Sequence, residues 1–154
     1  MRLALADSAA TEAAGAALGR ALPTDETVIY FQGDLGAGKT TLVRGMLHGL
    51  GHAGRVPSPT YTLVEPYEIG GRRLTHMDLY RIADPEELAY LGVRDLSGIL
   101  LVEWPERGAR FLPPADITVR LAVAEPGRVL ETQAFTPRGE AIERAWLGAY
   151  SGKS

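Results

Sequence analysis

The sequence contains no cysteine and no asparagine, and it is very poor in lysine. Without cysteine, the chain forms no disulfide, holds no metal through thiolates and has no cysteine nucleophile. Almost all of its basic residues are arginine, and lysine occurs only at Lys39 and Lys153. Since Lys153 is close to the end, Lys39 is the only lysine in the body of the chain.

Long apolar segments and a strong charge of one sign are also missing. No apolar run approaches the roughly 20 residues that a membrane span requires, and the first residues lack the apolar core of a secretory signal. The 16 basic and 19 acidic residues leave a net charge of −3. This balance argues against a protein that coats nucleic acid, although not against a local basic patch. We therefore expect a soluble protein of the cytoplasm.

The 154 residues, of which 45% are hydrophobic, have the length and balance of a single globular domain over residues 1–154. Alternating or β-branched segments predict strands at residues 2–6, 27–32, 61–69, 72–79, 99–102, 116–123 and 129–135. Helical spacing or composition predicts helices at residues 9–22, 41–50, 84–91 and 140–150. This order predicts an α/β fold with a mixed, mainly parallel sheet flanked by helices, extended by antiparallel hairpins around Gly70-Gly71 and Pro126-Gly127.

The strand predicted at 27–32 leads directly into a glycine-rich motif. Residues 33–40 read GDLGAGKT and match G-x-x-x-x-G-K-[ST]. In this motif the glycines let backbone N–H groups converge on phosphate oxygens, and the following helix directs its positive end at the same anion. Lys39 would reach the β- and γ-phosphates, and the Thr40 hydroxyl would bind Mg²⁺. The motif predicts a nucleoside-triphosphate site in a fold of the P-loop NTPase type.

A magnesium nucleotide also needs a carboxylate at the end of a neighbouring buried strand. Glu103 follows the apolar run Ile99–Val102, and Asp78 ends the strand-like run Leu74–Met77. Both fit the role of holding the metal or its water, and both also fit a surface acid at a strand end.

Other nearby residues are less specific when read alone. Ser58 and Thr60 lie in a loop bounded by prolines, which fits either a switch over the γ-phosphate or a plain connector. Trp104 fits packing more readily than chemistry. His76 fits either a general base or a structural strand histidine.

Taken together, these motifs resemble the TsaE (YjeE) family, the small bacterial P-loop ATPases of tRNA threonylcarbamoyladenosine biosynthesis. The combination is far more specific than the phosphate loop alone. Tyr61 stands where the family commonly has Phe, and the tail beyond about residue 135 aligns with no family motif. The matching stretches, in family order, are GDLGAGKTTLVRGM (33–46), VPSPTYTLVEPYE (56–68), HMDLYRI (76–82), DPEEL (84–88) and LLVEWPER (100–107).

The resemblance implies roles for individual residues. Lys39, Asp78 and Glu103 would be catalytic. Thr40 and Glu103 would bind Mg²⁺, and Asp78 would lie beside the metal or orient the attacking water. Trp104 would contact nucleotide or partner. The remaining residues that would contact or sense ATP are Gly36, Ala37, Gly38 and Thr41 at the phosphates, Thr11 and Arg128 near the adenine or ribose, and Ser58, Pro59 and Thr60 in a nucleotide-sensing loop.

The resemblance also implies partners and a biological role. The family acts with TsaB and TsaD, and the TsaD-type subunit transfers a threonylcarbamoyl group to adenosine 37 of tRNAs that read codons beginning with A. The chain would be an Mg²⁺-dependent ATPase, weak without its partners, whose hydrolysis of ATP resets that complex. It would contact tRNA only indirectly, through the complex. It would use no small-molecule acceptor and would bind no membrane.

Three alternatives remain open at this point. A small-molecule kinase needs an acceptor pocket and usually a closing lid, and no Arg-rich lid segment is evident. A GTP-dependent switch reads guanine through Asn-Lys-x-Asp, which a chain without asparagine lacks. A non-catalytic ATP-binding scaffold would bind nucleotide without turnover.

Overall fold

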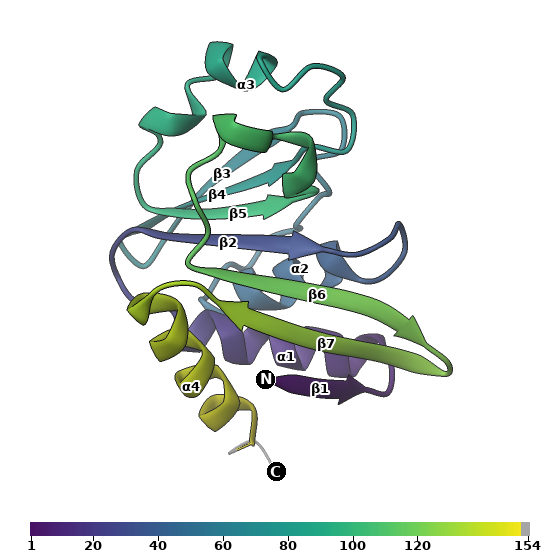
Figure 1. The fold of residues 1–154 in the computed structure, drawn as a ribbon. Coiled ribbons are helices and arrows are strands. Elements are labelled where there is room, and N and C mark those ends of the chain that lie inside the picture. Colours follow the sequence, from purple (N-terminus) through teal and green to yellow (C-terminus); the bar gives the residue numbers. More distant parts are fainter. Residues whose placement is uncertain (152–154) are drawn as a thin grey trace.

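The computed structural model describes residues 1–151. Seven strands form one sheet in the order β1-β7-β6-β2-β5-β4-β3 (Figure 1). The strands are β1 (Arg2–Leu5), β2 (Thr27–Gln32), β3 (Val64–Ile69), β4 (Arg72–Asp78), β5 (Ile99–Glu103), β6 (Ile117–Ala124) and β7 (Gly127–Ala134).

The sheet is parallel only at its centre. β2 pairs in parallel with β5 and β6, and β4 pairs in parallel with β5. The β3–β4, β6–β7 and β1–β7 pairs are antiparallel. A mixed sheet flanked by helices is therefore confirmed, but its parallel part is smaller than predicted. The reason is that β1 joins β7 in an antiparallel pair, in addition to the two predicted hairpins, whose short turns allow only antiparallel pairing.

The four α-helices lie close to the predicted positions. They are α1 (Ser8–Ala21), α2 (Lys39–Gly49), α3 (Glu87–Tyr90) and α4 (Pro137–Ser151). α1 begins one residue earlier than expected because the Asp7 carboxylate accepts the N–H of Ala10 at 2.8 Å and caps the helix. α4 begins at Pro137, a residue type that suits a first helical turn. None of the helices in the described part of the chain is both long and apolar enough to span a membrane.

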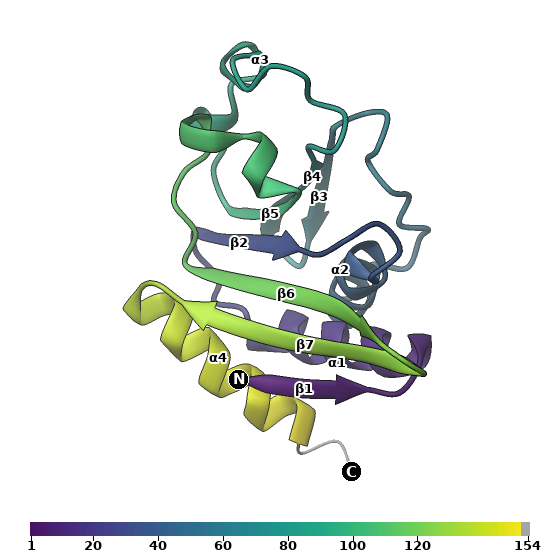
Figure 2. The ribbon, with the colours of Figure 1, turned by 45° about the vertical axis from the view of Figure 1, so that its right-hand side comes forward.

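The helices α1 and α2 lie side by side on one face of the sheet (Figures 1 and 2). They meet along a glycine seam formed by Gly15 and Gly19 of α1 and Gly45 and Gly49 of α2. A Cβ atom on Gly15 would lie 2.1 Å from the carbonyl oxygen of Leu42, and one on Gly45 would lie 2.2 Å from a carbonyl oxygen of α1. Only glycine permits this approach of the two backbones, which fixes the start of α2 relative to α1.

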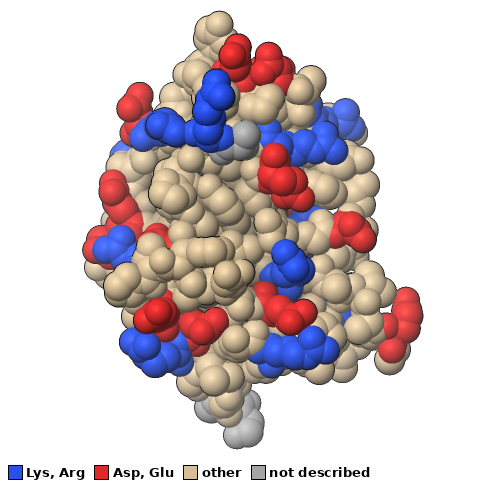
Figure 3. Space-filling view, viewed as in Figure 1, with Lys and Arg blue, Asp and Glu red and all other residues tan. Residues whose placement is uncertain are grey.

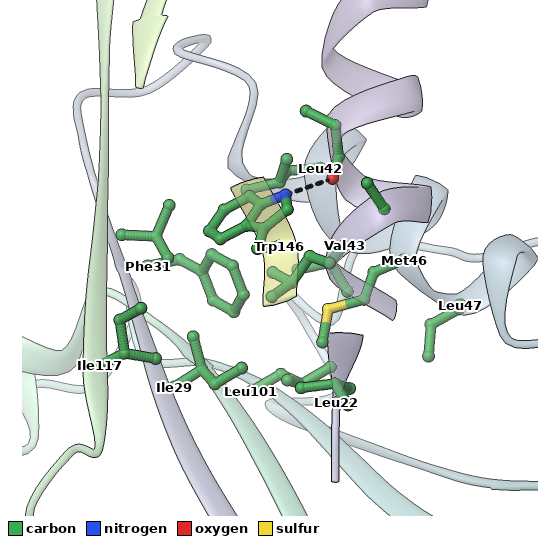
Figure 4. Close-up of a cluster of buried hydrophobic side chains, with 14 of the residues drawn as sticks. Leu22, Ile29, Phe31, Leu42, Val43, Met46, Leu47, Leu101, Ile117 and Trp146 are labelled. Carbon is green, nitrogen blue, oxygen red and sulfur yellow. Dashed lines mark hydrogen bonds between the residues drawn. The ribbon is translucent and has the colours of Figure 1, made fainter. Parts of the chain in front are cut away.

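Two apolar clusters cover the two faces of the sheet. The larger one joins the sheet to α1, α2 and α4, and Figure 4 shows Phe31, Val43 and Trp146 within it. The Trp146 indole N–H donates to the carbonyl of Ala14 at 2.9 Å, so α4 is tied to α1. The smaller cluster packs the segment 79–112 on the other face, over β2, β4 and β5.

Candidate functional site

The loop of residues 33–38 leaves the end of β2 at the centre of the sheet and leads into α2. Because β2, β4 and β5 run parallel, their carboxyl ends meet at this edge, which is where ligands bind in open α/β sheets. Gly33, Gly36 and Gly38 have φ angles of +147°, +79° and +108°. A Cβ atom on Gly33 would also lie 2.4 Å from the carbonyl oxygen of Leu121. The predicted glycines are therefore required by the path of the loop.

The first turn of α2 has the character of an anion site. Gly38 is its N-cap, and within the described chain no side chain caps the helix. The first N–H groups of an α-helix have no partner inside the helix, and they carry partial positive charge. A cavity of about 220 Å³ is lined by Gly38, Lys39, Thr40 and Thr41 of this turn, together with side chains of β4 and β5.

Lys39 is held inside the loop rather than extended into solvent. Its ammonium group donates to the carbonyl of Gly33 and, at 3.0 Å, to that of Asp34. It lies 4.4 Å from the centroid of the Trp104 ring, within range of a cation–π contact. Burial lowers the pKa of Lys39, and the nearby Glu103 carboxylate opposes that shift. The structure thus gives Trp104 a place over Lys39, at the edge of the cavity.

Glu103, the last residue of β5, is buried and directed at the start of α2. The Thr40 hydroxyl donates to its carboxylate, with Oγ1 3.1 Å from Oε2 and 3.2 Å from Oε1. On its other side, Nε2 of His76 lies 2.6 Å from Oε2. The Glu103 carboxylate therefore joins the start of α2 to the neighbouring strands β4 and β5.

Asp78 ends β4 and lies beside Glu103 in the register of the two strands. Its Oδ1 accepts the N–H of Tyr80 at 3.0 Å, and its Oδ2 accepts the Thr60 hydroxyl at 3.2 Å. Burial raises the pKa of Asp78, and the hydrogen bond from Tyr80 partly offsets this shift. Asp78 therefore places a second buried acid at the same end of the sheet.

The proline-bounded loop before β3 is tied to Asp78. The Ser58 and Thr60 hydroxyls lie 2.6 Å apart, and Thr60 continues to the Asp78 carboxylate. The backbone N–H of Asp78 donates to the carbonyl of Leu63 at 3.0 Å, and Leu63 has a φ of +68°. Ser58 and Thr60 line the same cavity as Lys39, whereas Pro59 contributes a carbonyl that accepts the Leu63 N–H.

A second cavity of about 350 Å³ adjoins the first. The two share Gly36, Ala37, Gly38 and Thr41. Thr11 and Arg128 line this second cavity, from α1 and β7 respectively. The Arg128 guanidinium donates to the carbonyls of Gly36 and Ala37, each at 3.2 Å.

Except for Pro59, the residues that the resemblance assigned to the site therefore lie around two adjoining cavities. The contact of His76 with Glu103 was not anticipated. His76 is fully buried, so it is poorly placed to be a general base acting on a ligand. Its position two residues before Asp78 in a strand puts both side chains on one face, which was a usable signal. Asp7 and Ser8, which also line the second cavity, were missed, although an aspartate before a helix is a capping signal.

The donor set fits magnesium bound together with phosphates better than a metal held by protein alone. Thr40, Asp78 and Glu103 supply hard oxygen atoms around one cavity, and Mg²⁺ commonly takes one or two carboxylates plus substrate phosphates and water. Within residues 1–151, no group of three His, Cys, Asp or Glu side chains is arranged to hold a metal ion. An ion here would need ligands from a bound nucleotide.

Comparison with known proteins gives consistent matches. The family model described as threonylcarbamoyl adenosine biosynthesis protein TsaE matches residues 5–130. The tRNA threonylcarbamoyladenosine biosynthesis protein TsaE of Haemophilus influenzae is 51% identical over 129 residues, which cover 81% of this chain and 82% of that protein. The protein of the same name from Synechocystis is 46% identical over 114 residues, which cover 70% of this chain and 71% of that protein. A crystal structure of Bacillus subtilis YdiB matches with a TM-score of 0.78 and 28% identity, covering 96% of this chain and 94% of that one.

Proposed function

Because the chain belongs to the TsaE family, we propose that it is an Mg²⁺-dependent ATPase that serves the threonylcarbamoyl modification of tRNA adenosine together with TsaB and TsaD homologues. The observation that carries this proposal is the convergence of the glycine loop, Lys39, the Thr40–Glu103 contact and Asp78 on one cavity. The adjoining cavity with Thr11 and Arg128 offers space for the nucleoside.

In this proposal, the chain's own groups bind and orient the triphosphate. The N–H groups of the loop and of the first turn of α2 donate to phosphate oxygens. The Lys39 ammonium exchanges its carbonyl partners for the β- and γ-phosphates, and it gains a more favourable charge partner by doing so. Magnesium supplies charge neutralisation on the phosphates when bound, and Thr40 and Glu103 are the residues that would hold it.

Hydrolysis would be an in-line displacement by water. The water oxygen attacks the γ-phosphorus, the bond to the β–γ bridging oxygen breaks, and the products are ADP and phosphate. Asp78 would orient that water; this role is supported by its position in the lining of the cavity, beside Thr60 and Glu103. Catalysis would come from positioning and from charge stabilisation rather than from covalent chemistry.

A role through partners agrees with the charges on the face that Figure 3 shows. On the face shown in Figure 3, basic and acidic side chains are interspersed and no broad area carries one sign. Such a face offers little for the phosphate contacts that dominate nucleic-acid affinity. We therefore propose that tRNA is reached through the TsaB and TsaD homologues, in the cytoplasm, and that ATP hydrolysis resets their complex between turnovers.

Three measurements test the proposal. Calorimetry with Mg·ATP should detect binding to the isolated chain, and steady-state phosphate release should rise when TsaB and TsaD homologues are added. A pull-down in ATP and in ADP should show that the association depends on nucleotide. The absence of Mg·ATP binding, with and without partners, would contradict the proposal. Turnover that requires an added metabolite would favour a kinase instead.

A further inference from the structure

His76 is a buried polar residue that the proposed reaction does not use directly. It lies in β4 with no exposed surface, on the same sheet face as Asp78. Its Nε2 atom lies 2.6 Å from Oε2 of Glu103, while its Nδ1 atom is buried with no hydrogen-bond partner among residues 1–151. With a proton on Nε2, the imidazole donates a hydrogen bond to the Glu103 carboxylate.

The Glu103 carboxylate is consequently held from two sides. Thr40 approaches it from α2 and His76 from the neighbouring strand. Of the two, only His76 lies in the sheet, whereas Thr40 lies in α2. The Thr40 hydroxyl is also among the atoms that would bind magnesium. If Thr40 turns to the metal, His76 remains as the contact that fixes the orientation of Glu103.

We propose that His76 is a positioning residue for magnesium binding: it holds the Glu103 carboxylate in place beside Thr40 before the magnesium nucleotide arrives. This inference rests on the proposed function and assigns a further residue to it. A group that hydrogen-bonds a metal-binding side chain commonly changes metal affinity by about 10- to 100-fold when it is removed. His76 therefore tunes affinity for magnesium without touching nucleotide.

Two amide substitutions separate this role from simple packing. In His76→Gln, the amide nitrogen lies near the position of Nε2 and still reaches Glu103. In His76→Asn, the shorter side chain places its amide near the position of Nδ1 and does not reach it. Both variants replace the ring by a smaller buried amide, so thermal melting reports how far each perturbs the fold. His48→Asn makes the same change at an exposed histidine and is the matched control.

The readout is the affinity for ADP at increasing magnesium, together with the affinity for ADP in EDTA. We expect His76→Asn to raise the magnesium concentration at half-saturation about tenfold, with ADP affinity in EDTA unchanged. His76→Gln should restore most of the wild-type magnesium dependence, and His48→Asn should match wild type. Equal magnesium dependence in His76→Asn and wild type would overturn the role of His76. So would equal losses in the Asn and Gln variants, because that result indicates packing alone.

A second measurement does not depend on the variant folding. In wild-type protein labelled with ¹⁵N-histidine, the Nε2 proton of His76 should give a downfield, slowly exchanging signal that shifts on adding Mg·ADP and is absent in Glu103→Ala. A signal that changes neither on adding Mg·ADP nor in Glu103→Ala would overturn the proposal. If wild-type protein binds ADP equally in magnesium and in EDTA while the His76 signal still responds to Glu103→Ala, the contact exists. In that case the role of His76 in magnesium binding fails, whereas the proposed function is tested separately by Mg·ATP binding and phosphate release.

Discussion

Asp78 lies directly opposite Glu103 in the parallel register of β4 and β5, so that two buried carboxyl groups share one end of the sheet. Both are nearly excluded from solvent, at 5% and 2% exposed. Burial is the main cause of the raised pKa of Asp78, and the charge of Glu103 adds to it. The fold therefore holds Asp78 in a position that costs stability, as binding and catalytic sites often do.

Removing that charge should stabilise the metal-free protein. The native state binds the Asp78 proton more tightly than the unfolded chain does, so stability falls as pH rises from the ordinary pKa of an aspartate, 3.8, through the raised native pKa. We expect Asp78→Asn in EDTA to gain roughly 1 kcal/mol, or about 2–4 °C in Tm, at neutral pH. The gain should fade towards pH 4. Asp95→Asn, at an exposed carboxyl, is the control, and a Tm that is lower for Asp78→Asn at pH 7 would contradict the argument.

Replacing Lys39 with alanine should weaken Mg·ATP binding by about 100-fold, because several charge-assisted hydrogen bonds to phosphate are lost. Isothermal titration measures the change. Lys153→Ala, at the only other lysine of the sequence, should bind as wild type does. Unchanged affinity in Lys39→Ala would mean that the loop does not bind phosphate.

Glu103→Ala should separate binding from turnover. ADP affinity in EDTA should stay within about threefold of wild type, because this side chain contacts Thr40 and His76 rather than the loop backbone. Phosphate release with the partner proteins should fall by about 100-fold or more. Glu140→Ala, at an exposed glutamate of α4, should leave both unchanged. Normal turnover in Glu103→Ala would shift the metal-binding role to Asp78.

Two glycines of the loop should differ in their tolerance of alanine. At Gly33, both the φ angle of +147° and a carbonyl at 2.4 Å oppose a Cβ atom, so Gly33→Ala should cost about 2–4 kcal/mol of folding stability. At Gly36, where φ is +79° and no atom lies within 4 Å, the cost should be about 1 kcal/mol. Urea unfolding compares the two, and equal losses would argue against this loop path.

Trp104 should report nucleotide binding by its fluorescence. Its ring lies 4.4 Å from the Lys39 ammonium, which phosphate is expected to draw away, whereas Trp146 is fully buried in the core. Titration with ADP should therefore change the emission of wild type and leave that of Trp104→Phe nearly constant. An equal change in both proteins would place the signal at Trp146.

Much of this architecture could be predicted from local patterns. The glycine spacing of residues 33–40 determined the loop, and the apolar runs before Asp78 and Glu103 located both carboxylates at strand ends. Turn residues located the β3–β4 and β6–β7 hairpins. In each case, neighbours in the sequence are also neighbours in the structure, so the pattern carries the information.

Other features depend on register and on backbone geometry, which the sequence pattern does not encode. The contact of His76 with Glu103 requires β4 and β5 to be adjacent and in one particular register. Trp104 lies over Lys39 with its own backbone at a φ of +57°. Bulky residues such as tryptophan rarely adopt this conformation. The extent of antiparallel pairing was underestimated because β1 joins β7 from the far end of the sequence.

The glycine seam between α1 and α2 has a consequence for motion. Where two backbones touch, neither helix can slide without a collision, so the seam holds Thr11 and the first turn of α2 in a fixed relative position. The segment with Ser58 and Thr60 is held by hydroxyl contacts, a few backbone hydrogen bonds and the Arg81 guanidinium over the Tyr61 ring. We expect the amide hydrogen-exchange rates of residues 56–63 to change when ADP replaces ATP. A protein that distinguishes the ATP-bound from the ADP-bound chain would accordingly have to contact residues 56–63.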